Sequence, residues 1–404
     1  MKPNLEHYRT IVGDGVIEEI YKKAKFLKGK HILHINSTYQ GGGVAEMLNS
    51  FVPLMNSIGI NLGWRILHGT PDFFTITKKF HHALQGDKIN LTKIKKQIYE
   101  EINEIFSTYT HIDHDVVVIH DPQPLPLIKF YKKRQPWIWR CHLDVSNPNP
   151  EILDFLKEYI ARYDLLIVSD EKYKIKDIAV EQRVVRPAID PLSPKNKEIS
   201  KDVISKYLKK FGIKTDKPLI TQVARFDKWK DPLGVIDIFK IVKKEVDCRL
   251  VLCGSKAADD PESEEIYNKV MSKAKKLVEN GDVKLITTEN HILVNSLQRS
   301  SAVIVQKSIR EGFGLAVTEA LWKGKPVVAS NVGGIPIQIK DGINGFLVEP
   351  HDTEGFAEKI IEILQKPELA KEMGKNGKEI VRNKFLITKL ISDHLDILNS
   401  VCNF

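Results

Sequence analysis

Short runs rich in β-branched residues alternate with helical stretches along almost the whole chain. Strands that alternate with helices form parallel sheets, because a parallel connection needs a crossover long enough to contain a helix. The alternation breaks near residues 188–196, where two prolines open a polar, lysine-rich stretch, and it restarts afterwards. A chain of 404 residues is also too long for one ordinary core. We therefore expect an α/β protein with two doubly wound, Rossmann-like domains, residues 1–188 and 189–385, that face a cleft.

The same alternation predicts where individual elements lie. Expected strands cover residues 31–36, 60–67, 115–121, 137–143, 165–169, 184–187, 219–224, 249–253, 283–286, 302–306, 327–329 and 345–348. Expected helices cover residues 44–58, 92–109, 151–163, 232–245, 263–280, 292–299, 313–323, 353–365 and 368–383. Ligands of doubly wound sheets bind beyond the carboxyl ends of the strands, so the loops that follow strands should carry the chemistry.

Composition argues against several classes of protein. With 42% hydrophobic and 28% charged residues, the chain is globular and not disordered. No apolar run approaches the ~20 residues that span a bilayer, and residues 1–6 lack the apolar core of a signal peptide, so we expect a cytoplasmic protein with no membrane partner. Four scattered cysteines without zinc-type spacing predict free buried thiols in a reducing compartment. The net charge of +9 is spread along helical faces without interleaved aromatics, which favours anionic ligands over a nucleic-acid partner.

Two carboxylates eight positions apart, Glu311 and Glu319, flank a Gly-Phe-Gly turn and the start of a helix. Gly312 and Gly314 allow a sharp turn and close approach of a ligand, and the N–H groups at the helix start favour phosphate. Glu319 lies about two helical turns beyond Glu311. This spacing suits a nucleotide-sugar held by its sugar, diphosphate and ribose. The plainer alternative is a helix-dipole residue and a surface residue, but residues 315–321 leave little polar face around Glu319.

A second motif follows the strand expected at residues 219–224, where Arg225 and Lys230 lie five positions apart. Two cations in one such loop can neutralise a diphosphate, with arginine as a planar fork and lysine as a point charge. In a transfer reaction they would stabilise charge that grows on a leaving phosphate. A solvated basic loop before a helix is the plainer alternative. Lys228 alternates with Lys230, and we expect it to point away.

Three glycines, Gly41, Gly42 and Gly43, lie between the first expected strand and the first expected helix. They allow the backbone to approach a ligand, and the helix start favours anions. The loop does not match Gly-x-Gly-x-x-Gly, and no dinucleotide fingerprint follows it. Two interpretations stay open: a tight turn, or a floor for the acceptor of a transfer reaction or for a diphosphate.

Histidines end two of the expected strands. His142 lies at the end of the apolar strand expected at residues 137–143, where its side chain would face the cleft and bind a sugar hydroxyl. Asp144 would share its face if the strand continued. His120 ends another strand and is a further candidate to line the cleft. For each histidine, a purely structural role is the alternative.

Several well-known catalytic patterns are absent from the sequence. No cluster of His, Cys and Asp has metal-ligand spacing, and neither a Gly-x-Ser-x-Gly elbow nor a Gly-x4-Gly-Lys-Ser/Thr loop occurs. These absences weigh against a metallohydrolase, an α/β-hydrolase and a P-loop enzyme. The sequence therefore predicts no metal site and requires no cofactor, while a dependence on Mg²⁺ stays open.

Taken together, these segments resemble the retaining glycosyltransferases of family 4, which have the GT-B fold. The two glutamates, the Arg-x4-Lys loop, the histidine after a strand and the early glycine loop follow that family's order over most of the chain. The resemblance implies that Arg225 and Lys230 bind the donor diphosphate. It implies that Glu311 contacts the donor hexose and Glu319 the ribose, while His142 contacts the sugar near its 6-hydroxyl. Backbone amides for sugar and phosphate would come from Gly312, Phe313, Gly314 and Leu315.

More narrowly, residues 34–46, 139–144 and 187–196 resemble the glycosyl-transferring trehalose synthases. Enzymes of that group join the glucose of a nucleoside-diphosphate-glucose to free glucose, giving trehalose. The resemblance implies that the first domain binds the acceptor and the second binds the nucleotide-sugar. It also implies that the last helix, within residues 386–404, crosses back to the first domain, as is common in GT-B folds. A homodimer stays open.

The implied chemistry is retaining transfer, with Arg225, Lys230, Glu311 and His142 as the catalytic candidates. No carboxylate is an obvious nucleophile, so we favour front-face transfer in which the leaving phosphate accepts the proton of the incoming hydroxyl. The nearest alternative is the same transfer to another acceptor, such as a sugar phosphate or a glucan. A sugar-nucleotide 2-epimerase and a non-catalytic sugar-nucleotide sensor are alternatives from other classes.

Overall fold

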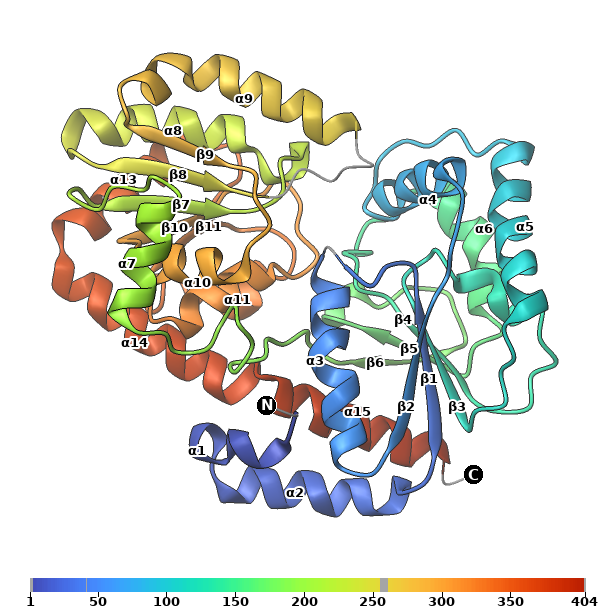
Figure 1. The fold of residues 1–404 in the computed structure, drawn as a ribbon. Coiled ribbons are helices and arrows are strands. Elements are labelled where there is room, and N and C mark those ends of the chain that lie inside the picture. The colour runs from blue at the N-terminus through green and yellow to red at the C-terminus, as the bar shows by residue number, and fades with distance from the viewer. Residues whose placement is uncertain (1–2, 41, 255–260, 403–404) are drawn as a thin grey trace. The chain divides into compact units, whose positions relative to one another are not determined.

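The computed structural model describes residues 3–40, 42–254 and 261–402 (Figure 1). The chain divides into two compact units, which are described one by one. Unit 1 comprises residues 1–188 and 387–404, and unit 2 comprises residues 189–386. The ends of unit 2 lie side by side, because the Ile189 N–H donates to the Phe385 carbonyl oxygen over 2.9 Å.

Unit 1 is built on a parallel sheet of six strands among the described residues. In spatial order the strands are β2 (Asn61–Ile66), β1 (His31–Asn36), β3 (Val116–His120), β4 (Trp137–Arg140), β5 (Leu165–Val168) and β6 (Glu181–Val184). The α-helices are α1 (Arg9–Val12), α2 (Asp14–Ala24), α3 (Gly43–Ser57), α4 (Pro71–Leu84), α5 (Lys93–Tyr109), α6 (Pro150–Ile160) and α15 (Ile387–Cys402). The inner strands are buried along almost their whole length because helices cover both faces of the sheet.

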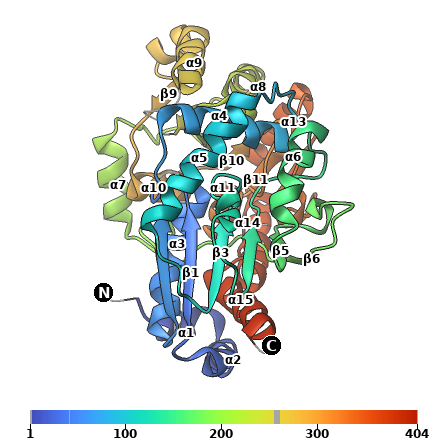
Figure 2. The same cartoon turned by 90° about the vertical axis from the view of Figure 1, so that its right-hand side faces the viewer.

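The two faces of this sheet carry separate apolar cores. Helices α4, α5 and α6 cover one face, where Phe80, Tyr99 and Phe155 pack together. Helices α2, α3 and α15 cover the other face, with Phe51 and Leu395 among the buried residues. Figure 2 shows α4, α5 and α6 together with strands β1, β3 and β5 of this sheet. Helix α15 thus completes a core to which the first residues of the chain also contribute.

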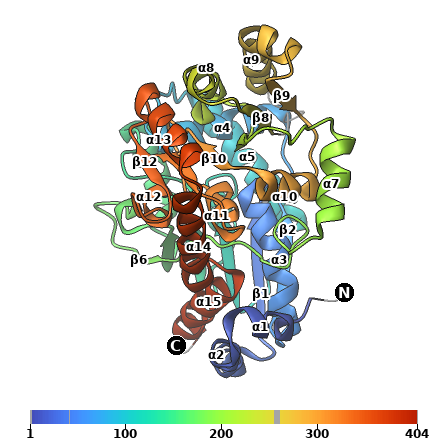
Figure 3. The same ribbon diagram turned by 90° about the vertical axis from the view of Figure 1, so that its left-hand side faces the viewer.

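Unit 2 repeats the layered plan with a second parallel sheet of six strands among the described residues. In spatial order the strands are β12 (Phe346–Val348), β11 (Val327–Ser330), β10 (Val303–Gln306), β7 (Leu219–Val223), β8 (Arg249–Cys253) and β9 (Val283–Ile286). The α-helices are α7 (Lys201–Lys210), α8 (Pro232–Glu245), α9 (Pro261–Glu279), α10 (His291–Ser300), α11 (Leu315–Trp322), α12 (Ile335–Gln338), α13 (Thr353–Gln365) and α14 (Pro367–Lys384). One core joins the sheet to α8, α9 and α13, and another joins it to α7 and α10 (Figure 3).

The strand orders locate the position in each sheet where the winding reverses. In unit 2 the chain winds outward from β7 through β8 to β9, then returns to the other side of β7 at β10. This is the classic dinucleotide-binding order, and its reversal lies between β7 and β10. In unit 1 the reversal lies between β1 and β3. Loops diverge at such a position and leave room for a ligand beyond the carboxyl ends of the strands.

The expected fold class, two doubly wound α/β domains, is confirmed by these two parallel sheets. The strand expected at residues 184–187 is wrong in position, because β6 covers Glu181–Val184 and pairs Leu165 with Glu181. This edge strand is only partly buried, so it lacks the apolar run that marks the inner strands. Helices α2, α4 and α7 lie outside the expected ranges.

Two simple expectations from composition can be compared with the structure. All four cysteines are free, as expected; Cys141, Cys248 and Cys253 are buried, whereas Cys402 is half-buried. Among the described residues, no helix is both long enough and apolar enough to cross a membrane.

Candidate functional site

The reversal in unit 2 brings two predicted motifs together. Lys230 comes from the loop after β7, and Glu311 comes from the loop after β10. The Lys230 ammonium lies 2.5 Å from the Glu311 Oε2 atom. The Glu311 carboxylate, which is 9% exposed, also accepts hydrogen bonds from Ser308 Oγ over 3.2 Å and Gln306 Nε2 over 3.3 Å. Two residues 81 positions apart in the sequence therefore form one ion pair at the carboxyl edge of the sheet.

Local contacts hold the Lys230 backbone in place. Asp227 Oδ1 accepts from the Trp229 and Lys230 amides over 2.9 and 3.0 Å, which caps the short 3₁₀ turn Lys228–Lys230. Gln222, on β7, donates from Nε2 to the Lys230 carbonyl oxygen over 2.7 Å. Lys230 therefore leaves the sheet at a fixed position.

A partly buried ion pair connects this loop to the loop that carries Glu311. Lys307, which is 2% exposed, bonds to the carboxylate of Asp231, and the Ile309 amide donates to the Trp229 carbonyl oxygen over 2.7 Å. Asp231 also caps α8 by accepting from the Gly234 amide over 2.9 Å. The two loops therefore form one structural unit.

The other cations of this loop have different surroundings. The Arg225 side chain is 57% exposed and lies 3.7 Å from Asp227 Oδ2. The Lys228 ammonium lies over the Trp229 indole, 4.7 Å from the ring centre, and Arg310 lies over the same ring. Arg225 is thus the accessible cation of the predicted pair, while Lys230 is held by Glu311.

Glu319 lies on α11 in a second, separate ion pair. Its side chain is almost fully buried, with Oε1 2.9 Å from the ammonium of Lys195, and Gln298 Nε2 lies 3.5 Å from Oε2. Lys323, one turn later, donates to Gln298 Oε1 over 2.7 Å and to Asn196 Oδ1 over 2.9 Å. Burial lowers the pKa of Lys323 to about 7.

Sequence reasoning missed Lys195 and Lys323 as neighbours of Glu319. The four-residue spacing between Glu319, on α11, and Lys323, the C-cap of that helix, was a signal in the sequence, because residues at that spacing lie on one helix face. Lys195 carried no signal, since it belongs to the polar stretch after the proline-rich break and meets Glu319 only through the fold.

The glycine turn before α11 has the conformation that its composition requires. Gly314 has φ +86° and is the N-cap of α11, which begins at Leu315. The helix expected from residue 313 therefore begins two residues later, because Phe313 is buried against Phe385 and precedes the left-handed residue. The first amides of α11 lack helical acceptors, as at any helix start. Gly312 completes the turn.

Close backbone packing in this region admits no side chain at two glycines. A Cβ atom on Gly333 would lie 1.6 Å from the Glu311 carbonyl oxygen, and one on Gly254 would lie 1.8 Å from that of Ala224. Gly254 follows β8, so it sets the path of the neighbouring residues that lead to Arg225. The space around Gly15, in α2, is open within 4 Å.

We expect Gly254→Ala to lower the free energy of unfolding by roughly 1–3 kcal/mol, because the backbone at Ala224 must shift to admit the methyl group. Gly15→Ala is the matched control and should raise it by up to about 1 kcal/mol, since alanine favours a helix. Urea denaturation of the three proteins measures both effects. Equal stability of Gly254→Ala and the wild type would contradict the packing argument.

In unit 1, the glycine loop follows β1 at the reversal of the sheet. Gly42 has φ +96° and is the N-cap of α3, and Gly43 is the first helical residue. The left-handed φ at Gly42 is one that side chains rarely adopt. Gly41 lies outside the described residues. Whether this loop contacts a ligand stays a prediction.

Three histidines of unit 1 form one hydrogen-bonded row. His34 Nδ1 lies 2.8 Å from His120 Nε2, and His120 Nδ1 lies 3.0 Å from His142 Nε2. His120 is 1% exposed, so it does not line a surface as expected but links His34 to His142. The His142 amide donates to Asp121 Oδ1 over 2.9 Å, which holds the backbone just after β4.

Asp144 is placed differently from the prediction. Strand β4 ends at Arg140, so the expected continuation to residue 143, which would have aligned Asp144 with His142, does not occur. The Asp144 carboxylate instead accepts from the Ser146 amide over 3.0 Å and from Ser146 Oγ over 2.5 Å. A role of Asp144 in binding a sugar stays a prediction.

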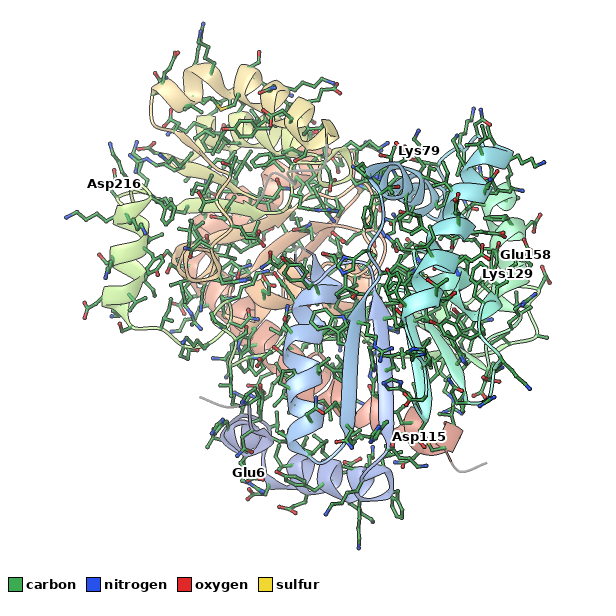
Figure 4. All side chains as sticks on the ribbon, turned by 45° about the vertical axis from the view of Figure 1, so that its right-hand side comes forward. Glu6, Lys79, Asp115, Lys129, Glu158 and Asp216 are labelled. Carbon is green, nitrogen blue, oxygen red and sulfur yellow. The ribbon has the colours of Figure 1, made fainter. Side chains whose placement is uncertain are left out.

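The amino edge of the same sheet differs from the carboxyl edge, because its described residues carry an ordinary ion pair and no row of histidines. Asp115, labelled in Figure 4, lies just before β3 and bonds to the Lys30 ammonium over 3.0 Å and to the His31 amide over 2.8 Å. The Asp115 carboxylate thereby connects the start of β3 to the start of β1. The row of histidines therefore marks the carboxyl edge as the chemically unusual one.

His394, on α15, gives unit 1 a specific pH dependence. Its ring packs against Phe51 with 4.8 Å between centres, and burial, together with the charge of Arg140, lowers its pKa to about 4. An unfolded histidine has a pKa of about 6.5. Below that pH the unfolded chain binds more protons than the folded one, so stability is present above about pH 6.5 and is lost on acidification toward about pH 4.

Acidification from about pH 7 to about pH 4.5 should lower the free energy of unfolding of both proteins. We expect this fall to be roughly 2 kcal/mol smaller in His394→Gln than in the wild type. Urea denaturation at each pH measures the two slopes. Parallel slopes would show that folding does not lower the pKa of His394.

Within the described residues, no group of three or more His, Cys, Asp and Glu side chains is arranged to hold a metal ion. The chemical groups gathered at the two reversals are instead cations, carboxylates, imidazoles and backbone amides. These groups suit a polar, anionic organic ligand.

Comparison with known proteins gives two family matches. A family described as "Trehalose synthase, N-terminal domain" matches residues 34–175, and one described as "Glycosyl transferases group 1" matches residues 203–380. Proteins named trehalose synthase are similar over nearly the whole chain. The one from Thermococcus litoralis is 48% identical over 98% of this chain and 97% of its own, and the one from Rubrobacter xylanophilus is 43% identical over 97% and 95%.

Solved structures with low sequence identity share the fold. A sucrose-phosphate synthase from Thermosynechococcus elongatus has a TM-score of 0.73 at 17% identity, covering 92% of this chain and 98% of its own. A UDP-forming trehalose-phosphate synthase from Burkholderia vietnamiensis has a TM-score of 0.73 at 13% identity, covering 93% and 99%. At these identities the likeness concerns the fold alone.

Proposed function

Because this chain belongs to the trehalose synthase family of GT-B glycosyltransferases, we propose that it is a retaining glucosyltransferase that makes trehalose. It joins the glucose of a nucleoside-diphosphate-glucose to free glucose. Residues 189–385 form the nucleotide-sugar-binding domain. Residues 1–188, together with the C-terminal helix within residues 386–404, form the acceptor-binding domain.

The observation that carries this proposal is the ion pair of Lys230 with Glu311 at the reversal of the second sheet. A carboxylate that can accept from sugar hydroxyls lies beside a cation that can bind phosphate, which is the pairing that a sugar diphosphate needs. Arg225 adds an exposed guanidinium to the same loop. In the ligand-free protein Glu311 keeps the Lys230 ammonium in place, so that little reorganisation precedes donor binding.

The remaining groups contact the ribose, the sugar and phosphates of the donor, and the acceptor. Glu319 binds the ribose, and its nearly complete burial supports a functional role, because a surface helix residue would be exposed. Amides of residues 312–315 bind the sugar and phosphate at the start of α11. In the acceptor domain, His142 binds a sugar hydroxyl, and Asp144 and the glycine loop of residues 41–43 complete the contacts.

The proposed reaction proceeds on one face of the donor sugar. An acceptor hydroxyl oxygen bonds to the anomeric carbon while the bond from that carbon to the diphosphate oxygen breaks. The proton of the hydroxyl passes to the leaving phosphate oxygen. Arg225 and Lys230 stabilise the charge that grows on this phosphate. Transfer on the face from which the phosphate leaves retains the anomeric configuration.

A product analysis tests the proposal. The protein is incubated with a panel of nucleoside-diphosphate-glucoses, with and without glucose, and the sugars and nucleotides are identified by chromatography and NMR. Trehalose and nucleoside diphosphate that appear together, and only when glucose is present, would support the proposal. Donor isomerised without acceptor, transfer only to a sugar phosphate or a glucan, or binding without turnover would each contradict it.

A further inference from the structure

The histidine row of unit 1 extends from the core of the domain to its carboxyl edge. His34 is 2% exposed, His120 is 1% exposed, and His142 is half-buried. The rings of His120 and His142 are nearly parallel, with 10° between their planes and 5.3 Å between their centres, and the rings of His34 and His120 are 5.1 Å apart. The three side chains therefore form one connected chain of imidazoles.

Strand register explains why three residues so far apart in sequence meet. His34, on β1, lies opposite Val118 on β3. His120 is two residues farther along β3 and lies opposite Arg140 on β4. His142 is two residues beyond Arg140. Side chains two positions apart on a strand share a face, so His120 lies one strand across from His34 and two residues nearer the carboxyl edge on the same face. His142 follows the end of β4, where the bond from its amide to Asp121 brings it beside His120.

The hydrogen bonds of neutral imidazoles impose an order on this row. A neutral histidine has one N–H donor and one bare nitrogen acceptor, so it cannot donate at both nitrogens or accept at both. His120 uses both of its nitrogens, one toward each neighbour. Only two arrangements satisfy both bonds: all three rings carry the proton on Nδ1, or all three carry it on Nε2. The tautomer of His142 is thus coupled to that of His34.

The surroundings of the row favour the neutral state that this order needs. Burial lowers the pKa of His34 to about 3 and holds the pKa values of His120 and His142 well below the ordinary histidine value. The charge of Arg140 acts in the same direction on His120 and His142. All three rings are neutral near pH 7, and each bond of the row joins a donor to an acceptor.

We propose that His34 and His120 are positioning residues that hold His142 in a single tautomer and ring orientation for contact with a sugar hydroxyl. The proposal rests on the proposed function in one respect, the sugar contact of His142. With its Nε2 engaged by His120, His142 presents only Nδ1 to a ligand, and the row decides whether that atom donates or accepts. Fixing this choice before the sugar binds removes a reorganisation that a solvated histidine would undergo.

The first test does not depend on activity. Long-range ¹H–¹⁵N NMR of the ligand-free protein, with its histidines labelled, reports the tautomer of each ring, and single histidine variants assign the signals. We expect His34, His120 and His142 to show the same tautomer near pH 7. Different tautomers among the three, or a His142 signal averaged between two tautomers, would overturn the proposal.

The second test uses paired variants of His120. His120→Leu removes both bonds of the row, whereas the amide of His120→Asn can still bond to His142 Nε2. We expect His120→Leu to give an averaged His142 signal and to lower kcat for transfer by about 10- to 100-fold, with the KM for the donor unchanged. His120→Asn should retain a single His142 tautomer and most of the activity. His7→Gln, on an exposed residue, is the control and should change neither readout.

The two tests separate this inference from the proposed function. If the wild type made no trehalose, the proposed function would fail while the NMR result would still decide whether the row is ordered. If His120→Leu folded and transferred glucose at the wild-type rate, the positioning role would be overturned even with an ordered row. If His120→Leu failed to fold, His120→Asn and the wild-type spectrum would still decide.

Discussion

Replacing Arg225 with alanine should lower the rate of glucose transfer by about 10²–10³-fold, since one cation that stabilises the leaving phosphate is lost. Lys230→Ala should have an effect of similar size for the same reason. Steady-state kinetics with a nucleoside-diphosphate-glucose and glucose measures kcat for both variants. Near-normal turnover in both would exclude a mechanism that depends on this loop.

The structure separates the two variants in their effect on stability. The Arg225 side chain is 57% exposed, so its removal should leave the free energy of unfolding nearly unchanged. Lys230→Ala leaves the buried Glu311 carboxylate without its cation, and breaking such a pair is costly. The double variant Lys230→Ala/Glu311→Gln removes both charges and should recover stability but not activity. Recovery of both would mean that the pair is structural.

Lys228 provides a matched control for the loop. It has the same charge two positions from Lys230, and its ammonium lies over the Trp229 ring. Lys228→Ala should therefore keep most of the transfer rate. A loss as large as that of Arg225→Ala would show that the net charge of the loop, and not the position of each cation, carries the effect.

Much of the fold followed from local patterns in the sequence. Strands such as β5 and β8 are short, largely apolar runs, and their positions were predicted because strands that are buried on both faces have this composition. Edge strand β6 and helices α2, α4 and α7 were misplaced or missed. Partly exposed elements carry weaker patterns, and packing against neighbours decides where they begin and end.

The candidate site was predictable residue by residue but not in its arrangement. The spacing of Arg225 and Lys230, and of Glu311 and Glu319, indicated anionic and sugar ligands. The pairing of Lys230 with Glu311 depends on β7 and β10 being neighbours, and strand order leaves no local signal. The Lys195 partner of Glu319 is hidden for the same reason.

The histidine row shows the same limit for strand register. Each of its members was visible as a residue in or after an apolar strand. Their alignment depends on the pairing of β1 with β3 and of β3 with β4. A shift of one residue in either pair would turn the histidines to opposite faces of the sheet. Register is set by the whole core, so no single segment of sequence predicts the row.

Glu319→Gln should weaken the binding of a nucleoside diphosphate by about 10- to 100-fold, since a charged acceptor for the ribose hydroxyls is replaced by a neutral amide. Isothermal titration calorimetry measures the dissociation constant. Glu358→Gln, on an exposed residue of α13, is the control and should bind like the wild type.

The change in charge acts against the predicted weakening of nucleotide binding. In the ligand-free protein the Glu319 carboxylate lies 2.9 Å from the Lys195 ammonium, so the variant removes the negative charge from that ion pair. The loss of this negative charge makes the site more positive, which by itself would attract the diphosphate and tighten binding. Weaker binding by Glu319→Gln would therefore have to come from the loss of specific contacts, and it would appear in spite of the change in charge.

A comparison of two proteins with two nucleotides tests whether the lost contacts are made to the ribose. The wild type should bind a 2′,3′-dideoxy nucleoside diphosphate more weakly than the parent nucleotide, because the carboxylate loses its donors. Glu319→Gln should bind the two nucleotides with nearly equal affinity, since its main ribose contact is already absent. An equal penalty for the deoxy nucleotide in both proteins would place Glu319 away from the ribose. Its burial beside Lys195, Gln298 and Lys323 would then be a structural network that orders α11 behind the phosphate site.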